Sequence, residues 1–314
     1  MSNILIVGSS NTDMIAKVEN FPQPGETIHG LTYMEAMGGK GANQAIAANR
    51  LGGQVRFITC LGDDPNGRTT LDYYRNENLD VSASRIVRGV PSGTAMILVD
   101  GQGENCIVVT PGANHELKPD YIWQIEEEIS EANLVLMQME IPCETVKTVS
   151  AICKKYHIQL FLNVAPAKQL DDELIRAVDV LIVNETEAEM ITGEEIEVVG
   201  KEGIVDRLRV MGATTVVLTL GKEGCYFKND KESFCTPAFE VDAVDTTAAG
   251  DTFCGALVTE ISKGSNLKDA VRFASAASAI TVTKMGAQPS IPTAEEVLRF
   301  LQAYDEKQPV EHSI

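Results

Sequence analysis

Short apolar segments recur along the chain, and stretches with helical periodicity separate them. The apolar segments cover residues 134–137, 160–162, 180–183 and 216–218, and the helical stretches cover residues 143–156, 171–178, 199–211, 248–263 and 267–284. A strand that is apolar at every position is buried on both faces, which occurs when helices cover both sides of a parallel sheet. The pattern therefore predicts a three-layer, doubly wound α/β fold with a mostly parallel sheet.

Two segments interrupt this alternation. Residues 13–37 carry Pro22, Pro24 and Gly25 between strand-like runs, and residues 92–110 hold two such runs around a glycine-containing turn. The second segment is typical of a β-hairpin. We expect the two segments to form a small β-sheet lid over an active site, although an extension of the main sheet would explain them too.

The chain is long enough for one large domain. It has 314 residues, of which 44% are hydrophobic, and no linker divides it. We therefore expect residues 1–314 to form a single domain that includes the lid segments. The formal net charge is −19. Because this charge repels polyanions, it argues against nucleic acid or an acidic membrane surface as a partner.

Targeting and redox features favour the cytoplasm. No run approaches the roughly 18 consecutive apolar residues that a membrane-spanning helix needs. The N-terminus lacks the basic region of a signal peptide and is typical of a first strand. The seven cysteines are dispersed without a Cys-x-x-Cys pair, which indicates reduced thiols. The four histidines show no zinc-site spacing.

Residues 244–253, with the sequence Val-Asp-Thr-Thr-Ala-Ala-Gly-Asp-Thr-Phe, lead into an apolar helix. Small side chains let a ligand approach the backbone, and free N–H groups at a helix start attract anions. The segment is therefore a candidate cradle for a phosphoryl group, with Asp251 placed to accept a hydroxyl proton. Simple capping of the helix by Asp251 and Thr252 would explain the same residues.

A glycine-rich segment, Gly-Gly-Lys-Gly-Ala-Asn at 38–43, precedes a helix expected over residues 44–51. It lacks the ending of a Walker A loop, and Gln44 stands where the dinucleotide fingerprint requires glycine. A P-loop nucleotidase and a nicotinamide dehydrogenase are therefore disfavoured. Backbone amides with Lys40 and Asn43 suit a polyhydroxyl ligand, although a turn that feeds a helix would also use these glycines.

Polar side chains follow several predicted strands, at the edge where open α/β sheets bind ligands. Asn11 and Asp13 follow the first strand and suit vicinal hydroxyls, and Glu140 follows the strand that begins at residue 134. All three are also common in turns.

Two later segments can likewise be interpreted either as ligand contacts or as ordinary structural features. Asn184 and Glu187 offer hard oxygen atoms that suit magnesium through water, but they also match a helix N-cap with an acidic first turn. Residues 219–224 form a glycine-containing turn that suits phosphates, although the signal is weak by itself.

The order of four motifs carries a resemblance to a known family. The motifs are Gly-Gly-Lys-Gly-Ala-Asn at 38–43, Asn-Glu-Thr-Glu at 184–187, Thr-Leu-Gly at 219–221 and Asp-Thr-Thr-Ala-Ala-Gly-Asp-Thr-Phe at 245–253. From Ile4 to about Pro292 the chain resembles the ribokinase-like (PfkB) sugar kinases. Members of this family transfer the γ-phosphoryl group of ATP to a sugar hydroxyl. The resemblance implies D-ribose as the sugar and its 5-hydroxyl as the acceptor.

The resemblance also implies a role for each matching residue. Asp251 is expected to be the catalytic base, and Ala248, Ala249 and Gly250 to form the anion hole. The expected sugar contacts are Asn11, Asp13, Gly39, Lys40, Gly41, Asn43, Glu140 and Asp251. The expected ATP contacts are Asn184, Thr219, Leu220, Gly221, Lys222, Glu223, Gly224, Gly250, Asp251 and Ser275, where Ser275 replaces a larger polar side chain of related kinases.

Two metal ions and a dimer follow from the same resemblance. Asn184 and Glu187 match the family's Asn-x-x-Glu motif, which is linked to Mg²⁺ through water. The expected K⁺ site consists of Asp245, Thr247, Thr281, Lys284, Gly286 and Ser290, mostly through backbone carbonyls. The lid is expected to pair with the lid of a second copy in a homodimer.

Other interpretations stay open at this point. A kinase of the same family could act on deoxyribose, fructose or a nucleoside such as adenosine, although Asn11 favours a sugar that keeps its 2-hydroxyl. A non-catalytic sugar-binding protein is the alternative from another class, and the intact Asp251, Asn184 and Glu187 argue against it.

Overall fold

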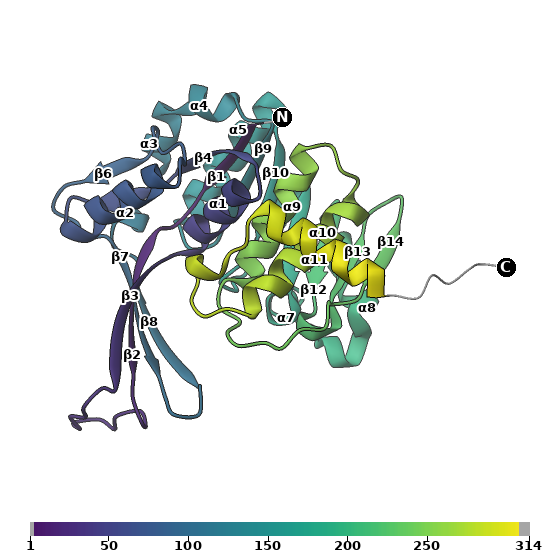
Figure 1. Ribbon diagram of the computed structural model, residues 1–314. Coiled ribbons are helices and arrows are strands. Elements are labelled where there is room, and N and C mark those ends of the chain that lie inside the picture. Colours follow the sequence, from purple (N-terminus) through teal and green to yellow (C-terminus); the bar gives the residue numbers. More distant parts are fainter. Residues whose placement is uncertain (1–2, 308–314) are drawn as a thin grey trace.

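The main sheet of the protein has eight strands in the order β14-β13-β12-β11-β10-β9-β1-β4. The computed structural model describes residues 3–307 (Figure 1). The strands are β1 (Asn3–Val7), β4 (Gln54–Ile58), β9 (Leu134–Gln138), β10 (Gln159–Asn163), β11 (Val180–Asn184), β12 (Thr215–Thr219), β13 (Cys225–Lys228) and β14 (Ser233–Thr236). The six neighbouring strands β4, β1, β9, β10, β11 and β12 run parallel to one another. Strands β13 and β14 extend the sheet beyond β12 in antiparallel pairing. The predicted mostly parallel sheet is confirmed.

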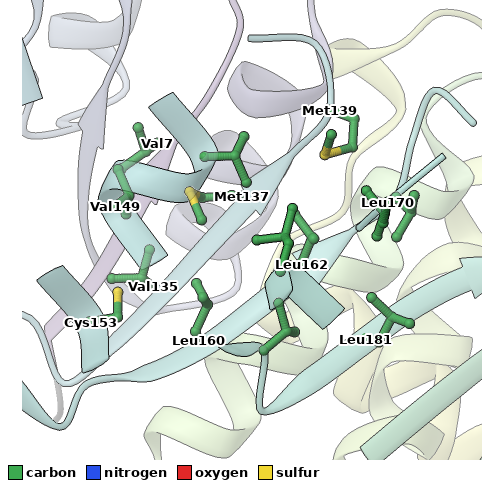
Figure 2. Close-up of a cluster of buried hydrophobic side chains, with 14 of the residues drawn as sticks. Val7, Val135, Met137, Met139, Val149, Cys153, Leu160, Leu162, Leu170 and Leu181 are labelled. Atoms are coloured by element: carbon green, nitrogen blue, oxygen red, sulfur yellow. The ribbon is translucent and has the colours of Figure 1, made fainter. Parts of the chain in front are cut away.

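The central strands are apolar at nearly every position because they are buried on both faces. Along β9, Leu134 and Leu136 join one core cluster, whereas Val135 and Met137 join the other. Successive side chains of a strand point to opposite faces, so each face needs its own apolar residues. Figure 2 shows one of these clusters, in which Val135 lies near Leu160 and Met137 near Leu162 of the neighbouring strand.

Helices cover both faces of the sheet, as the sequence pattern predicts. One face packs against α3 (Pro119–Gln124), α4 (Glu126–Ser130), α5 (Cys143–Tyr156), α6 (Asp172–Ala177), α7 (Glu185–Thr192) and α8 (Ile196–Met211). The other face packs against α1 (Lys40–Arg50), α2 (Pro65–Asn76), α9 (Ala249–Ser262), α10 (Leu267–Val282) and α11 (Ala294–Lys307). Within residues 3–307, no helix is long and apolar enough to cross a bilayer.

A second sheet of four strands forms the lid. Its order is β3-β2-β7-β8, with β2 (Asn11–Lys17), β3 (Thr32–Gly38), β7 (Gly93–Val99) and β8 (Asn105–Thr110). It projects away from the helix-covered body (Figure 1). The two segments that interrupt the sequence pattern thus form a separate sheet, and an extension of the main sheet is excluded. A small third sheet pairs β5 (Cys60–Gly62) with β6 (Arg85–Val87).

Two expected helix boundaries were wrong. The helix expected from residue 44 already begins at Lys40, so Gly41 and Asn43 lie in its first turns rather than in a loop. The helix expected from residue 199 begins at Ile196 and has a non-helical break at Gly200, with φ of 73° and ψ of 165°. Glycine adopts this left-handed backbone region without the steric cost that a side chain brings.

Candidate active site

A cavity of about 450 Å³ lies between the lid sheet and the carboxyl ends of the central parallel strands. Lid strands β2, β7 and β8 line one side of it, and Asn163, Asn184 and Thr219 line it from the ends of β10, β11 and β12. The segment from Thr246 to Asp251 closes a further side. Ligands of open α/β sheets bind at this edge, which makes the cavity the candidate active site.

The start of α9 presents free backbone N–H groups to this cavity. Ala248 precedes the helix in the left-handed region, with φ of 61° and ψ of 8°, which is uncommon for a residue with a side chain. The N–H groups of Gly250 and Asp251 find no acceptor in the described part of the chain, whereas that of Ala249 donates to the Thr246 carbonyl over 3.2 Å. A Cβ built on Gly250 meets no atom within 4 Å. This corner therefore has both the donors and the space for an anion.

Asp251 lies in the first turn of α9 and is buried. Its Oδ2 accepts a hydrogen bond from the Asn43 amide over 2.9 Å, and its Oδ1 accepts one from the Gln44 amide over 3.0 Å. Asp251 also lies close enough to Lys40 to hold the pKa of that ammonium above its ordinary value, although burial opposes this effect. The carboxylate is thus oriented by donors on α1 and faces a cation.

Glu140 joins α1 to the end of β9. Its Oε2 accepts hydrogen bonds from the Ser9 hydroxyl over 2.6 Å and from the Lys40 backbone N–H over 3.0 Å. Because this carboxylate receives an N–H group at the start of α1, it stabilises a helix that begins with glycine on either side of Lys40. Gly39 itself has φ of 91°, and a Cβ there would lie 2.8 Å from the Asn11 nitrogen.

Asp13 lies on β2 of the lid sheet with its carboxylate among other acids. Burial raises its pKa to about 7, and the nearby charges of Glu140 and Asp251 add to the effect. Desolvation and like charges both disfavour the ionised form of a carboxyl group. The cavity thus holds an acid that is only partly ionised near neutral pH.

Asn11, on the same strand, is held by Asn114 of the 3₁₀ turn Gly112–Glu116. The Asn114 amide donates to Asn11 Oδ1 over 2.8 Å and to the Ser10 carbonyl over 3.1 Å, while its oxygen accepts from Ser10 N–H over 2.9 Å. These bonds leave the amino group of Asn11 to serve a ligand. Asn11 and Asp13 follow β1, as expected, and both lie in strand β2 of the lid sheet.

Asn184 and Glu187 form a capping box at the start of α7. Asn184 Oδ1 accepts from Glu187 N–H, and Glu187 Oε2 accepts from Asn184 N–H, each over 2.8 Å. Both side chains also line the cavity. Burial raises the pKa of Glu187, and Asp251 adds to this, whereas Asn184 N–H and Lys40 oppose it. The helix-capping interpretation is confirmed, and the position of both side chains at the cavity is compatible with a ligand site.

The expected potassium residues come together only in part. Asp245 Oδ1 accepts from the Thr247 N–H and hydroxyl over 2.9 and 2.6 Å, and its Oδ2 accepts from Gly286 N–H over 2.8 Å. Side chains of the other three are engaged elsewhere: Thr281 with Thr252, Lys284 with Glu296, and Ser290 with the Ala287 carbonyl. The loop before α9 is thus tied to the segment after α10.

The expected ATP residues divide into two groups. Thr219, Asn184, Gly250 and Asp251 line the cavity. Ser275, on α10, does not, and neither do Leu220, Gly221, Lys222, Glu223 and Gly224, which form a 3₁₀ turn and its flanks beyond β12.

Several residues of the site were missed by sequence reasoning. Gln44, Gln138 and Gln288 form hydrogen bonds that lead to Asp251, and Asn163 and Cys254 line the cavity. Their side chains carry no formal charge at neutral pH and belong to no motif with an evident mechanism. Their place at the ends of strands or one residue beyond a recognised motif was the only available signal.

Comparison with known proteins decides the family. The model of the pfkB family carbohydrate kinases matches residues 1–294. The chain belongs to the pfkB family. The resemblance seen in its ordered motifs is therefore confirmed, and a dehydrogenase is excluded.

Individual pfkB relatives are similar over their full length. A ribokinase of Haemophilus influenzae is 42% identical over 302 residues, which cover 95% of this chain and 98% of the relative. The crystal structure of a ribokinase from Thermotoga maritima is 37% identical and has a TM-score of 0.87, with 96% of this chain and 100% of that chain covered. An Arabidopsis thaliana ribokinase, solved in complex with ribose and ATP, is 30% identical with a TM-score of 0.89 and coverages of 96% and 99%.

Proposed function

We propose that this pfkB kinase transfers the γ-phosphoryl group of ATP to the 5-hydroxyl of D-ribose. The observation that carries the proposal is the position of Asp251, which lies between the polar side chains of the lid side and the free N–H groups of α9. Full-length similarity to ribokinases, including the one solved with ribose and ATP, supports the choice of substrates.

The transfer forms a bond between the 5-oxygen of the sugar and the γ-phosphorus, and it breaks the bond from that phosphorus to the oxygen of ADP. Asp251 orients the hydroxyl and takes its proton late, because a carboxylate is a weak base toward an unreacted alcohol. The N–H groups of Gly250 and Asp251 stabilise charge on the transferring group. Since phosphoryl transfer is loose, positioning and charge stabilisation provide most of the rate enhancement.

Sugar recognition is assigned to the lid side of the cavity. The amino group of Asn11 donates to a hydroxyl, and Asp13 and Glu140 accept from hydroxyls, as do carboxylates in many polyol sites. Lys40 adds a donor next to Asp251. The Asn43 amide contributes through Asp251, to which it already donates.

ATP would occupy the side that faces α9. Open space at Gly250 fits a phosphoryl group, and Thr219 and Asn184 lie toward the rest of the nucleotide. Asn184 and Glu187 would hold Mg²⁺ through water, since this ion keeps most of its water shell and needs few carboxylates. Bound there, Mg²⁺ would neutralise phosphate charge. Ser275 and residues 220–224 lie outside the cavity lining, so they would contact the part of ATP that extends beyond the cavity.

A potassium ion is assigned to the loop around Asp245. The Asp245 carboxylate already accepts hydrogen bonds from Thr247 and Gly286. Main-chain carbonyls of the two segments that it connects would complete the coordination shell of the ion. A cation there orders the loop that leads to Ala248 and so stabilises the orientation of the free N–H groups.

The lid is proposed to pair with a second copy. Strand register places Ala95, Ile97 and Ile107 on the cavity face and Met96 and Val108 on the other face. Met96 and Val108 are 49% and 56% exposed. An apolar face that is exposed on a small sheet is typical of an interaction surface, because its contact with water is unfavourable. The lid of a second copy would supply a matching apolar surface.

A cytoplasmic location is proposed from the cysteines. All seven are free thiols, four of them buried. Free, dispersed thiols persist in reducing compartments.

The decisive experiment is a coupled assay of ADP release with ATP, Mg²⁺ and D-ribose, repeated with 2-deoxyribose, fructose and adenosine. We expect turnover with ribose, stimulation by K⁺, and loss of turnover but not of ribose binding in Asp251→Asn. Preference for another acceptor would replace ribose as the substrate. ADP release that no acceptor stimulates would contradict a sugar kinase.

A further inference from the structure

Two chains of buried amides end on the two carboxylate oxygens of Asp251. In the first, Gln138 Nε2 donates to Gln44 Oε1 over 2.6 Å, and Gln44 Nε2 donates to Asp251 Oδ1 over 3.0 Å. In the second, Gln288 Nε2 donates to Asn43 Oδ1 over 3.1 Å, and Asn43 Nδ2 donates to Asp251 Oδ2 over 2.9 Å. Each of the two carboxylate oxygens of Asp251 thus accepts a hydrogen bond from a buried amide.

In the first of these hydrogen-bond chains, only one orientation of the Gln44 amide is compatible with all of its partners. The amino group of Gln44 donates to Asp251 and also to Asn163 Oδ1 over 3.1 Å, and its oxygen accepts from Gln138. Reversal of the Gln44 amide would place its oxygen against the Asp251 carboxylate and its amino group against that of Gln138. The Asp251 carboxylate, which can only accept, and the amino group of Gln138, which can only donate, therefore together fix which end of Gln44 faces Asp251.

This arrangement is kept although it leaves atoms unsatisfied. Oε1 of Gln138 and Oε1 of Gln288 are buried and have no hydrogen-bond partner within residues 3–307. An unpaired buried acceptor is destabilising, so apolar residues would serve a purely structural role better. The two orphaned oxygens lie at the outer ends of the two chains, where the amino ends of the same amides point toward Asp251.

Gln44 and Gln138 do not touch the ligand space. Both are fully buried, and neither lines the cavity. Any effect of these two amides on catalysis must therefore pass through the residues that they hold, which are Asp251 and, for Gln44, also Asn163 at the cavity wall.

We propose that Gln44, oriented by Gln138, is a positioning residue for the base of the proposed phosphoryl transfer. A hydrogen bond to the ionised carboxyl favours that form and resists rotation of the group. Each carboxylate oxygen accepts more than one hydrogen bond, so the sugar hydroxyl still finds an acceptor. The proposal rests on the assignment of Asp251 as the base.

The test compares Gln44→Met, Gln138→Met, the double variant and Thr145→Val. Thr145 is a buried polar residue on the opposite helix layer and serves as the control for loss of a buried hydrogen bond. We expect Gln44→Met to lower kcat about tenfold or more, as misplacement of a reacting group does, while the KM values for ribose and ATP change by less than about threefold. The acidic limb of its pH–kcat profile should move to higher pH.

Gln138→Met should show the same changes more weakly, and the double variant should match Gln44→Met, because Gln138 acts only through Gln44. Thr145→Val should lower the melting temperature without moving kcat or the pH limb. The proposal is overturned if the two effects on kcat are additive, or if the pH limb stays in place. If Gln44→Met does not fold, the test rests on Gln138→Met alone. The proposal is then overturned if the acidic limb of the pH–kcat profile of Gln138→Met matches that of the wild type. Failure of the wild type to phosphorylate any sugar would instead overturn the proposed function.

Discussion

The side-chain amide of Asn114 donates a 2.8 Å hydrogen bond to Oδ1 of Asn11, although the two residues are 103 positions apart in the chain. Asn114 comes from the turn after β8, and Asn11 begins β2. The turn thereby sets which end of the Asn11 amide faces the cavity.

We expect Asn114→Leu to weaken ribose binding more than ATP binding. Without its partner the Asn11 amide reverses freely, and a misdirected donor at a sugar hydroxyl costs about 1–3 kcal/mol, or roughly 5- to 150-fold in KM for ribose. Steady-state kinetics with each substrate varied in turn measures this. Asn11→Ala serves as the matched variant and should lose selectivity between ribose and 2-deoxyribose. Equal rises in both KM values would contradict the prediction.

The raised pKa of Asp13 predicts a pH dependence of stability. Its carboxyl has a pKa of about 7 in the folded protein and near 3.8 when unfolded, so between these values the folded state binds more protons. The contribution of Asp13 to the stability of the ligand-free protein should therefore fall as pH rises from about 4 to about 7, by roughly 4 kcal/mol at most. Asp13→Asn removes this contribution.

Thermal unfolding of both proteins between pH 5 and 8 tests the point. The difference in melting temperature between Asp13→Asn and the wild type should grow in favour of the variant as pH rises. A difference that stays constant with pH would show that Asp13 does not titrate in this range. The comparison with the variant cancels the titration of other carboxyl groups.

Gly250→Ala should separate stability from activity. Because a Cβ at this position meets no protein atom, and alanine favours helix over glycine, the variant should be more stable by up to about 1 kcal/mol. The same methyl group fills the space assigned to the phosphoryl group, so kcat/KM for ATP should fall about tenfold or more. Calorimetry and initial rates measure the two effects, and an active variant would move the phosphoryl group away from this corner.

A charge on the outer face of the lid should break the dimer. Val108→Asp buries an unpaired carboxylate in an apolar contact, which is strongly unfavourable. We expect the wild type to sediment as a dimer and Val108→Asp as a monomer at micromolar concentration. Val210→Asp places the same charge on α8, at a side chain that is 77% exposed, and should leave the dimer intact. A monomeric wild type would contradict a lid-mediated dimer.

The sheet and the lid were predictable because their signals are local. A strand buried on both faces must be apolar throughout, as β9 is, and the prolines and glycines of residues 13–37 stop that pattern. Strands β13 and β14 gave no such signal, since each has only four residues and β14, which lies at the edge of the sheet, is only partly buried.

The site was predictable where a motif carries it, and not where distant residues complete it. Helix α1 begins at Lys40 despite the neighbouring glycines because Glu140, 100 residues away, accepts the Lys40 N–H. Local propensity predicts a later start. No sequence motif assigns a role to the amides of Gln44 and Gln138, and only the folded chain brings them to Asp251.

The contacts of Asp251 also set the moment during biosynthesis at which the site is complete. Asn43 lies 208 residues before Asp251. Gln288, which donates a hydrogen bond to Asn43, lies 245 residues after Asn43. A ribosome makes the chain from the N-terminus, so the sugar-side residues and the lid exist long before the base or the second amide chain. A nascent chain that ends before Asp251 thus lacks the proposed base, so phosphoryl transfer would begin only after the ribosome has passed the start of α9.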